Sequence, residues 1–261
     1  MIKQALWWIL VTLVVGFAFL YPFMNHPEAL VTPPPIETTE ASEPMPDFAK
    51  YQQVSEKKKA FFAYLRPEVE RQNDYLIRLR LQIKNMQQDF AEKGQLSSTD
   101  SKRLKWLLNE YNIEPKLSVQ QQFDLLMRRV DIIPVDLVLV QAANESAWGT
   151  SRFAREGFNL YGLWCFRKGC GFVPKRRNSG ADHEVAKFDN LSRATYTYMR
   201  NLNRHPAYTQ LRDIRHKLRL NQKPISGIAL SEGLMQYSER GEDYIEELQH
   251  MIRINKEYIS S

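Results

Sequence analysis

An apolar stretch near the N-terminus restricts the fold of this chain more than any other feature. From Ala5 to Met24 it contains no charged residue. About 20 such residues, as a helix, cross the roughly 30 Å of hydrocarbon in a bilayer. Lys3 precedes the stretch and the next basic residue is Lys50, and positive charge tends to stay on the cytoplasmic side. We predict that residues 1–24 form a cytoplasmic tip and a transmembrane signal anchor, with the rest of the chain exported.

Two other interpretations of this stretch stay open. A cleaved signal peptide has a shorter apolar region of about 7–15 residues, followed by a small-x-small cleavage site. Here the run is longer and ends in the aromatic segment Phe19–Phe23, without such a site. A buried core helix is the second alternative.

Residues 25–47 are rich in Pro, Thr, Glu and Ser, a composition that cannot build a core. We predict a flexible linker there. Residues 1–48 contain one lysine and five acidic residues, so their net charge is −4. Since the whole chain has a net charge of +6, residues 49–261 have a net charge of +10. A basic, exported body suits an anionic polymer or a membrane surface, and export disfavours nucleic acid as a partner.

From Phe48 onward apolar residues recur at a spacing closer to 3.6 than to 2, which is typical of helices. Pro67 predicts a break in the first long helix. The cluster Ser97-Ser98-Thr99-Asp100 and Ser118 predict helix starts. Strand-type alternation is scarce and heptads are not sustained, so a coiled coil is a weak alternative. The pattern predicts a mainly α fold, in which residues 48–117 form a helical N-terminal extension.

The next helix carries a carboxyl group at its end. Pro134 suits a first helical position, and the run Leu137–Val140 makes the helix apolar nearly all round. At helical spacing Glu145 continues the apolar stripe of Val138, and Gly149 then allows a turn. A partly desolvated carboxyl group has a raised pKa, which a general acid needs at neutral pH. A solvated Glu on a last helical turn is the alternative.

Two motifs surround this carboxyl group: Asn144-Glu145-Ser146-Ala147-Trp148-Gly149 and Asn159-Leu160-Tyr161-Gly162. In these the chain resembles the bacterial glucosaminidase domains of glycoside hydrolase family 73, in the branch that contains the Bax protein. Further similar segments are Ala186–Asp189, Arg204–Tyr208 and Tyr237-Ser238 leading to Tyr244. The resemblance covers about Ser118 to Ile254, and Tyr51 to Asn73 also looks like that branch.

The resemblance implies a lysozyme-like helical catalytic domain over residues 118–261 and peptidoglycan glycan strands as the substrate. It implies an endo-beta-N-acetylglucosaminidase in which Glu145 is the general acid. The uncharged span and the lysine before it predict a single pass through the inner membrane, with the catalytic domain in the periplasm. Glycoside hydrolysis usually needs a second carboxylate. Relatives place it in a variable loop, where Glu184 is our candidate and Asp182 the next, although this basic, cysteine-bearing loop departs from the family pattern.

Aromatic rings stack on the apolar faces of sugars, so aromatic residues in or beside the motifs are candidate substrate contacts. The candidate substrate-binding residues are Ser146, Trp148, Asn159, Tyr161, Trp164 and Tyr237. The role of Tyr237 near the scissile sugar is implied by relatives. Trp148 is as well suited to core packing, and Asn159 to capping a turn.

Both cysteines, Cys165 and Cys170, follow the predicted anchor, and a short Cys-x4-Cys loop closes readily in an oxidising compartment. We predict a disulfide; two free thiols or a half-built metal site are the alternatives. A structural zinc ion is bound by four ligands, and the five histidines show no His-Glu-x-x-His spacing. No metal and no cofactor is therefore predicted, and a metal-dependent peptidase or amidase is disfavoured.

Two other functions compete with glycan hydrolysis. A lytic transglycosylase also uses a Glu-Ser motif, and Gly233–Gln236 looks like one of its motifs, but it follows Glu145 by 88 positions instead of a short interval. A non-catalytic cell-wall binding or scaffolding protein is the second alternative, and it has no need of a desolvated acid. The sequence predicts contact with peptidoglycan and the inner membrane and identifies no protein partner.

Overall fold

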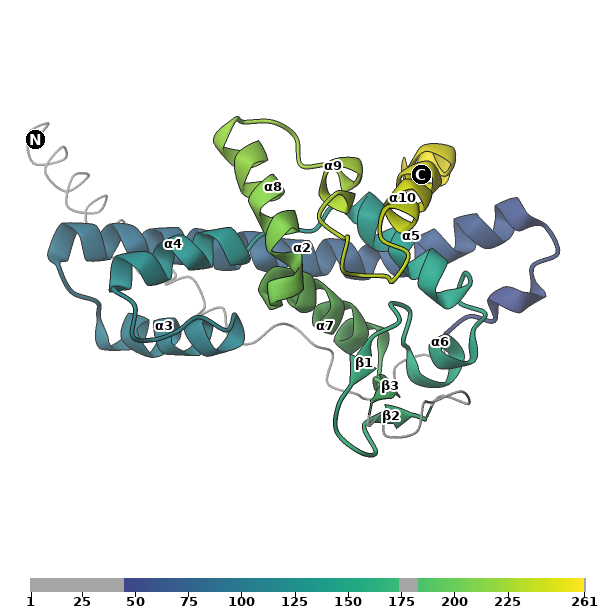
Figure 1. The fold of residues 1–261 in the computed structure, drawn as a ribbon, viewed down its shortest axis with the longest axis horizontal. Coiled ribbons are helices and arrows are strands. Elements are labelled where there is room, and N and C mark those ends of the chain that lie inside the picture. The colour runs from purple at the N-terminus through teal and green to yellow at the C-terminus, as the bar shows by residue number, and fades with distance from the viewer. Residues whose placement is uncertain (1–44, 174–182, 261) are drawn as a thin grey trace, which may run out of the picture. The chain divides into compact units, whose positions relative to one another are not determined.

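The computed structural model describes residues 45–173 and 183–260, which form a mainly helical body with one small sheet (Figure 1). The predicted membrane anchor and the predicted linker up to residue 44 lie outside these residues. Within the two described ranges, none of the helices has the length and apolar character needed to cross a bilayer. The helical elements are η1 (Phe48–Lys50), α2 (Val54–Lys93), α3 (Ser98–Glu110), α4 (Val119–Arg129), α5 (Val135–Ser146), α6 (Arg152–Gly157), α7 (Leu191–Arg204), η2 (Pro206–Tyr208), α8 (Thr209–Leu220), α9 (Gly227–Ser231), α10 (Glu242–Ile254) and α11 (Lys256–Ser260).

Helix α2 runs unbroken through Pro67, so the predicted break is wrong. A proline inside a helix costs about 3 kcal/mol, because it lacks the N–H and its ring crowds the preceding turn. The apolar side chains of α2 that are 0% exposed lie on both sides of it: Phe61, Phe62, Leu65, Val69, Leu79 and Ile83. Each buried side chain of this size contributes about 1.5–3 kcal/mol, so burial outweighs the proline. Helix α2 packs against α4, α5 and α7, and thereby joins the predicted extension to the rest of the body (Figure 1).

The predicted helix starts at Ser97 and Ser118 are confirmed. The Ser97 hydroxyl accepts a hydrogen bond from the Asp100 N–H and caps α3. Ser118 and Gln121 form a capping box at the start of α4, in which each side chain accepts from the other residue's backbone N–H. These local bonds satisfy N–H groups that a helix leaves unpaired at its first turn.

Helix α5 lies in the core, between α2, α9 and α10. The side chains of residues 137–140 are 0% exposed, as their apolar run predicts. The helix ends one residue after Glu145, and Ala147, Trp148 and Gly149 then have φ of 51°, 58° and 76°. Gly149 is needed at this turn, since a Cβ there would lie 2.5 Å from Cδ2 of Phe48. The turn leaves Glu145 on the last turn of a helix that is fixed by the core.

The sheet lies between α6 and α7 in the chain and has the strand order β1, β3, β2 (Figure 1). Its strands are β1 (Trp164–Cys165), β2 (Gly171–Phe172) and β3 (Glu184–Ala186). Both pairings are antiparallel, with Cys165 opposite Glu184 and Phe172 opposite Val185. Such short strands give no alternation that a sequence pattern could reveal.

Candidate active site

A cleft of about 1210 Å³ lies beside the last turn of α5. Glu145 lines it from α5, and residues 162–167 line it from the segment that enters β1. Residues 169–171, residues 186–189 from the end of β3 onward, and the last turns of α7 also line it. Residues 205, 207 and 208 after α7 and residues 236–238 complete the wall. The cleft therefore lies between the end of the core helix and the small sheet.

Glu145 is half-buried, and its Oε1 accepts a hydrogen bond of 2.8 Å from the hydroxyl of Tyr244 in α10. Burial raises the pKa of Glu145, because it disfavours the charged carboxylate. The hydrogen bond from Tyr244 favours the carboxylate and opposes this shift. Burial is the larger effect, so the pKa of Glu145 lies above its ordinary value of 4.5. The expected partial desolvation of this carboxyl group is therefore present.

A chain of hydrogen bonds behind Glu145 fixes the direction of each proton. The Tyr198 hydroxyl donates to Oε1 of Gln141, and Nε2 of Gln141 donates to the Tyr244 oxygen at 3.0 Å. A tyrosine hydroxyl has one proton, so the Tyr244 proton is given to Oε1 of Glu145. When Glu145 is protonated, its own proton therefore lies on Oε2.

The oxygen Oε2 lies against Gly162, which lines the cleft. A Cβ at this position would be 3.0 Å from Oε2, and Gly162 has φ of +63°, which favours glycine. The glycine of the Asn-Leu-Tyr-Gly motif thus leaves room for the carboxyl oxygen that carries the acidic proton.

Tyrosine rings form one wall of the cleft next to Glu145. Tyr237 and Tyr208 both line it. The Tyr237 ring stacks on Tyr244 with centroids 5.6 Å apart, and its hydroxyl donates to the Tyr161 carbonyl at 2.6 Å. Burial raises the pKa of Tyr208 to about 12, so its hydroxyl stays protonated at neutral pH. Tyr237, a candidate substrate-binding residue, thus lines the same cleft as Glu145.

Trp164 also lines the cleft, from β1, and 50% of its surface is exposed. Its ring contacts His183 edge-on, with centroids 4.5 Å apart. A half-exposed indole in a cleft offers a flat face to a sugar ring.

Three other candidates lie behind the cleft wall instead of lining it. The Ser146 hydroxyl donates to the Ala142 carbonyl and accepts from the Gly149 N–H, at 2.6 and 2.7 Å. Tyr161 is 0% exposed, and its hydroxyl pairs with Thr195. The buried Asn159 amide donates to the carbonyls of residues 163 and 186, at 2.8 Å each. These side chains hold the turn after α5 and the segment that enters the sheet.

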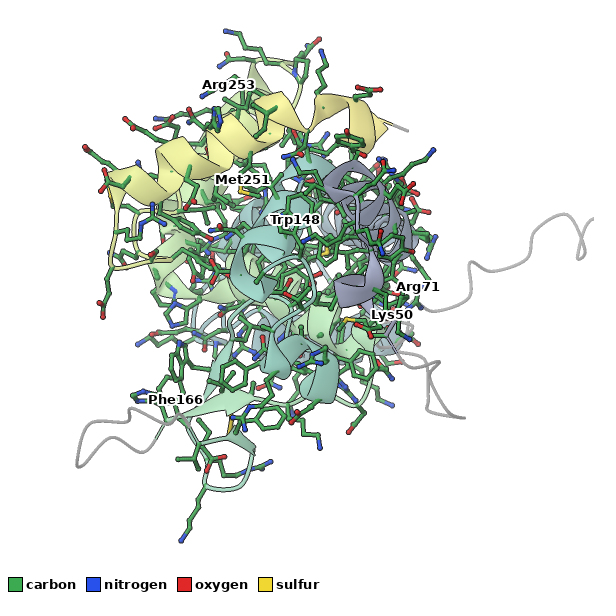
Figure 2. The ribbon with its side chains drawn as sticks, turned by 90° about the vertical axis from the view of Figure 1, so that its right-hand side faces the viewer. Lys50, Arg71, Trp148, Phe166, Met251 and Arg253 are labelled. Atoms are coloured by element: carbon green, nitrogen blue, oxygen red, sulfur yellow. A yellow bond between two sulfur atoms is a disulfide. The ribbon has the colours of Figure 1, made fainter. Side chains whose placement is uncertain are left out.

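Trp148 points away from the cleft, into the contact between α5 and α2. Its ring packs on Phe61 and Phe62, with centroids 5.7 and 5.2 Å away. Together with Met251 it lines a separate hollow of about 380 Å³ (Figure 2). The surroundings of Trp148 therefore fit core packing, the alternative to substrate binding for this residue.

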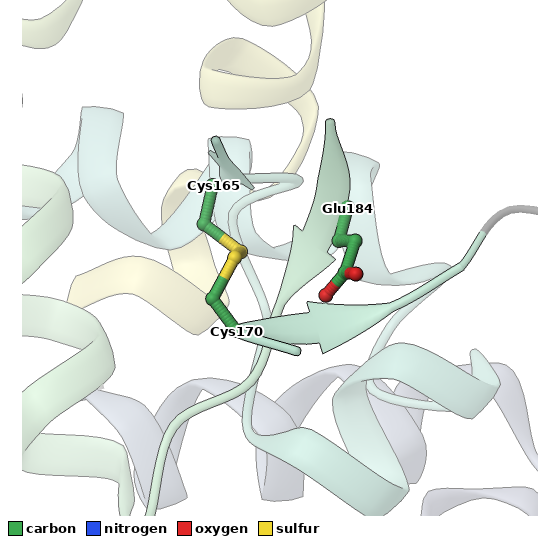
Figure 3. Close-up of side chains that lie close together, drawn as sticks. All are labelled: Cys165, Cys170 and Glu184. Atoms are coloured by element: carbon green, nitrogen blue, oxygen red, sulfur yellow. A yellow bond between two sulfur atoms is a disulfide. The ribbon is translucent and has the colours of Figure 1, made fainter. Parts of the chain in front are cut away.

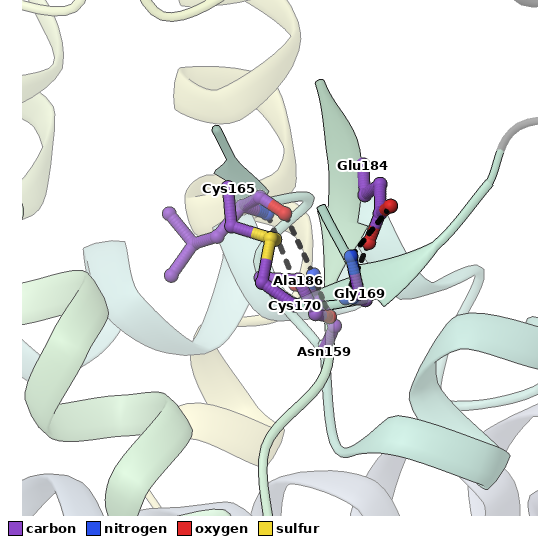
Figure 4. The surroundings of a disulfide bond; sticks show 8 residues. Asn159, Cys165, Gly169, Cys170, Glu184 and Ala186 are labelled. Carbon is purple, nitrogen blue, oxygen red and sulfur yellow. Dashed lines mark hydrogen bonds between the residues drawn. A yellow bond between two sulfur atoms is a disulfide. The ribbon is translucent and has the colours of Figure 1, made fainter. Parts of the chain in front are cut away.

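The loop between β1 and β2 is closed by a disulfide between Cys165 and Cys170, both of which line the cleft (Figure 3). Glu184 is 4% exposed and holds this loop from β3 (Figure 4). Its two carboxylate oxygens accept the backbone N–H groups of Gly169 and Gly171, at 2.9 and 2.8 Å. The carboxylate of Glu184 thus faces the loop backbone, and Glu184 is absent from the cleft lining.

Two acidic residues are among the described residues that line the cleft, Glu145 and Asp189. Asp182, the second candidate from the sequence, lies outside the described residues. The two sulfurs and the Glu184 carboxylate lie within 4.8 Å of one another. A disulfide sulfur is not the thiolate that binds zinc, so this group as it stands is not a metal centre.

Sequence reasoning did not identify Gln141, Tyr198 or Tyr208 as parts of the site, and it gave Tyr244 no role. A signal for Gln141 was present, because an amide inside an apolar helix must find a buried partner. The partner itself is 103 positions away in the chain, and no local pattern specifies it.

Comparisons with known proteins agree with this geometry. Residues 120–257, which include Glu145, match the family model "Glucosaminidase: Mannosyl-glycoprotein endo-beta-N-acetylglucosaminidase". The chain is 31% identical over 221 residues to the protein bax of Escherichia coli (strain K12), an alignment that covers 84% of this chain and 77% of that protein. No solved structure matches the chain significantly. The family match covers more than half of the chain and contains the half-buried acid, so this chain belongs to the glucosaminidase family.

Proposed function

We propose that this chain is an endo-beta-N-acetylglucosaminidase that hydrolyses glycosidic bonds in the glycan strands of peptidoglycan. The observation that carries the proposal is Glu145, a half-buried carboxyl group at a cleft, with a pKa raised by burial, inside a glucosaminidase domain. A neutral carboxyl group can give its proton to the leaving glycosidic oxygen while the C–O bond breaks. Membership of the family supports glycosidase chemistry in general, and the bond and the polymer are parts of the proposal.

In the proposed reaction Oε2 of Glu145 is the oxygen that donates, since Oε1 is occupied by the Tyr244 proton. Water then completes the hydrolysis, and its proton restores the acid. A carboxylate usually activates the water or stabilises the sugar cation. Asp189 lines the cleft, and the Glu184 carboxylate, outside that lining, accepts two N–H groups of the loop backbone. We therefore take Asp189 as the candidate for this role. The stacked wall of Tyr237 and the exposed ring of Trp164 suit the apolar faces of sugar rings.

The finer assignments of fold and location belong to the same proposal. A core helix that brings the acid to a cleft, with a small sheet opposite, supports a lysozyme-like domain. The uncharged stretch at residues 5–24 and the lysine before it support a single pass through the inner membrane with the catalytic domain in the periplasm. A reporter protein fused after Ser261 should be active only if exported. Activity of a reporter that works solely in the cytoplasm would contradict this topology.

Replacement of Glu145 by Gln tests the catalytic assignment, because the amide keeps the shape of the side chain and lacks the acidic proton. We expect kcat to fall by about 10²–10⁴-fold, with the melting temperature little changed. Release of soluble fragments from purified peptidoglycan measures the rate. Mass spectrometry of the fragments identifies the reaction: reducing-end N-acetylglucosamine is the expected product.

Other products would point to other enzymes. Reducing-end N-acetylmuramic acid would assign the cut to the other glycosidic bond, and an anhydro sugar would indicate a lytic transglycosylase. Fragment release at the wild-type rate by the Glu145→Gln variant would rule out Glu145 as the acid of either enzyme. No fragment release by the wild-type chain would favour a wall-binding protein.

A further inference from the structure

The cleft has a basic lining that acid catalysis does not use. The cations that line it are Arg167, Lys187, Arg200 and Arg204. Arg200 is paired with Glu110 at 3.0 Å. Arg167, Lys187 and Arg204 make no ion pair with any residue in the described ranges. The acidic residues on the same lining are Glu145 and Asp189, so the cations outnumber them.

These three cations reach the cleft from separate elements. Arg204 lies in the last turn of α7, and Lys187 follows β3 directly. Arg167 lies in the loop that the disulfide closes and that Glu184 holds. The Lys187 ammonium group lies 5.8 Å from the centre of the Phe172 ring. Three positive charges that have no ion-pair partner in the described part of the chain lie on one concave surface, and such a surface attracts anions.

We propose that this basic lining binds the carboxylates of the stem peptides, so that the enzyme's substrate is the peptide-bearing glycan strand. The inference rests on the proposed function and adds a binding site to it. N-acetylated sugars are neutral, and so is the lactyl group of muramic acid when its carboxyl is in amide linkage to a peptide. The negative charge of an intact strand is therefore on its peptides. Guanidinium groups such as those of Arg167 and Arg204 match carboxylates in shape and charge.

The same chemistry has a second source. When the peptide is removed from muramic acid, the lactyl carboxylate becomes free, and the strand then carries one anion close to the sugar ring. A peptide carboxylate projects further from the ring than a lactyl carboxylate does. The cations line the cleft from the disulfide loop, the residue after β3 and the end of α7, which are elements other than the α5 turn that carries Glu145, so we assign them to the more distant anion.

Binding to three soluble ligands of equal length tests the inference. These are peptide-bearing strands, peptide-free strands with lactyl carboxylates, and neutral chitin oligosaccharides. The full chain with Glu145→Gln is used throughout, so that affinity is measured without cleavage. We expect the tightest binding to peptide-bearing strands, with a preference over chitin that falls as salt screens the charges.

Substitutions in the same background identify the cations. Arg204→Gln and Lys187→Gln should each reduce the preference for peptide-bearing strands over chitin by about two- to fivefold, the range of exposed ion pairs. Arg204→Lys keeps the charge and should keep most of the preference. Arg253→Gln is the matched control, since Arg253 is exposed on α10, outside the cleft lining and far from Phe166 of the disulfide loop in Figure 2.

Three results would overturn the inference: equal affinity for peptide-bearing strands and chitin, an equal loss of both in the Arg204 and Lys187 variants, or equal binding of the two acidic strands. The last result would show that the lining does not distinguish the two anions, and tighter binding of the peptide-free strand would assign the lining to the lactyl carboxylate. Because affinity is measured without cleavage, failure of the wild-type chain to cut peptidoglycan would count against the proposed function alone.

Discussion

The acidity of Glu145 is set by two opposing influences, burial and the hydrogen bond from Tyr244. In the proposed reaction Glu145 must be protonated, so we expect activity to fall as the pH rises through the pKa of Glu145. The Tyr244 bond lowers that pKa, because it stabilises the carboxylate. It also orients the carboxyl group, since Gln141 forces the single Tyr244 proton toward it. The Tyr244 hydroxyl thus fixes the geometry of the carboxyl group and reduces the fraction of Glu145 that is protonated at high pH.

We expect Tyr244→Phe to separate these two effects. Loss of the hydrogen bond raises the pKa of Glu145 further, so the high-pH limb of the kcat profile should move to higher pH. The loss of orientation should lower the maximal kcat by about 10- to 100-fold. The measurement is kcat against pH for peptidoglycan cleavage.

Tyr75→Phe is the matched control for this substitution. The Tyr75 hydroxyl is also buried but has no hydrogen-bond partner in the described part of the chain. Its removal should leave the pH profile in place. A lower kcat in Tyr244→Phe with an unmoved limb would mean that Tyr244 acts on packing alone and not on the acid.

At the scale of the elements, the loop between β1 and β2 is held by a disulfide and by hydrogen bonds to one buried carboxylate. The disulfide joins its ends, and the Glu184 carboxylate accepts two of its N–H groups. A glutamine has one acceptor oxygen, so Glu184→Gln should leave one of these N–H groups without its partner, at a cost of about 1–3 kcal/mol. We expect a lower melting temperature and a higher KM, with kcat within about threefold of the wild type. The reason is that the loop would contact the substrate equally in the ground state and in the transition state.

Asp189→Asn provides the comparison for the second carboxylate. If Asp189 activates the water, kcat should fall by about 10²–10⁴-fold with little change in melting temperature. The opposite pattern, a large loss of kcat in Glu184→Gln at unchanged stability, would assign catalysis to Glu184 and contradict the loop-holding role.

Local sequence patterns predicted several helices, but they could not predict contacts between residues that are distant in the chain. The caps at Ser97 and Ser118 and the apolar helix that ends at Glu145 depend on neighbouring residues, and the structure has them. The break at Pro67 was wrong because burial of the faces on both sides is a tertiary effect. For the same reason the site was predicted in part: its acid stands in a motif, whereas the partner of Gln141 comes from α10.

At the scale of the whole described body, one buried aspartate joins two helices, α2 and α8, to the segment before α5. Asp131, in the segment before α5, is 3% exposed. Its carboxylate lies 3.6 Å from Arg80 of α2, and 4.0 and 2.7 Å from Arg215 and Arg219 of α8. Arg215 is itself 1% exposed, and burial lowers its pKa to about 10. The cluster fixes the start of the helix that carries Glu145.

Asp131→Asn should therefore lower the free energy of unfolding by about 3–5 kcal/mol, because it leaves the buried Arg215 without its counter-charge. Asp213→Asn is the matched control: its partner Arg128 lies 3.5 Å away and both side chains are about half exposed, so the loss should stay below about 1 kcal/mol. Denaturant unfolding at pH 7 measures both. A loss in Asp131→Asn no larger than in the control would show that the cluster contributes specificity and not stability.

The same variant has a defined dependence on pH. Burial alone would raise the pKa of Asp131, but the hydrogen bond from Arg219 and the charges of Arg215 and Arg80 outweigh it, so the pKa lies below its ordinary value of 3.8. A carboxyl group with a depressed pKa contributes stability that is fully present above pH 3.8 and is lost as the pH falls through the folded-state value. The difference in unfolding free energy between the wild type and Asp131→Asn should thus be constant near neutral pH and shrink in acid. A difference that grew as the pH fell would mean that the cluster is held by groups other than the Asp131 carboxylate.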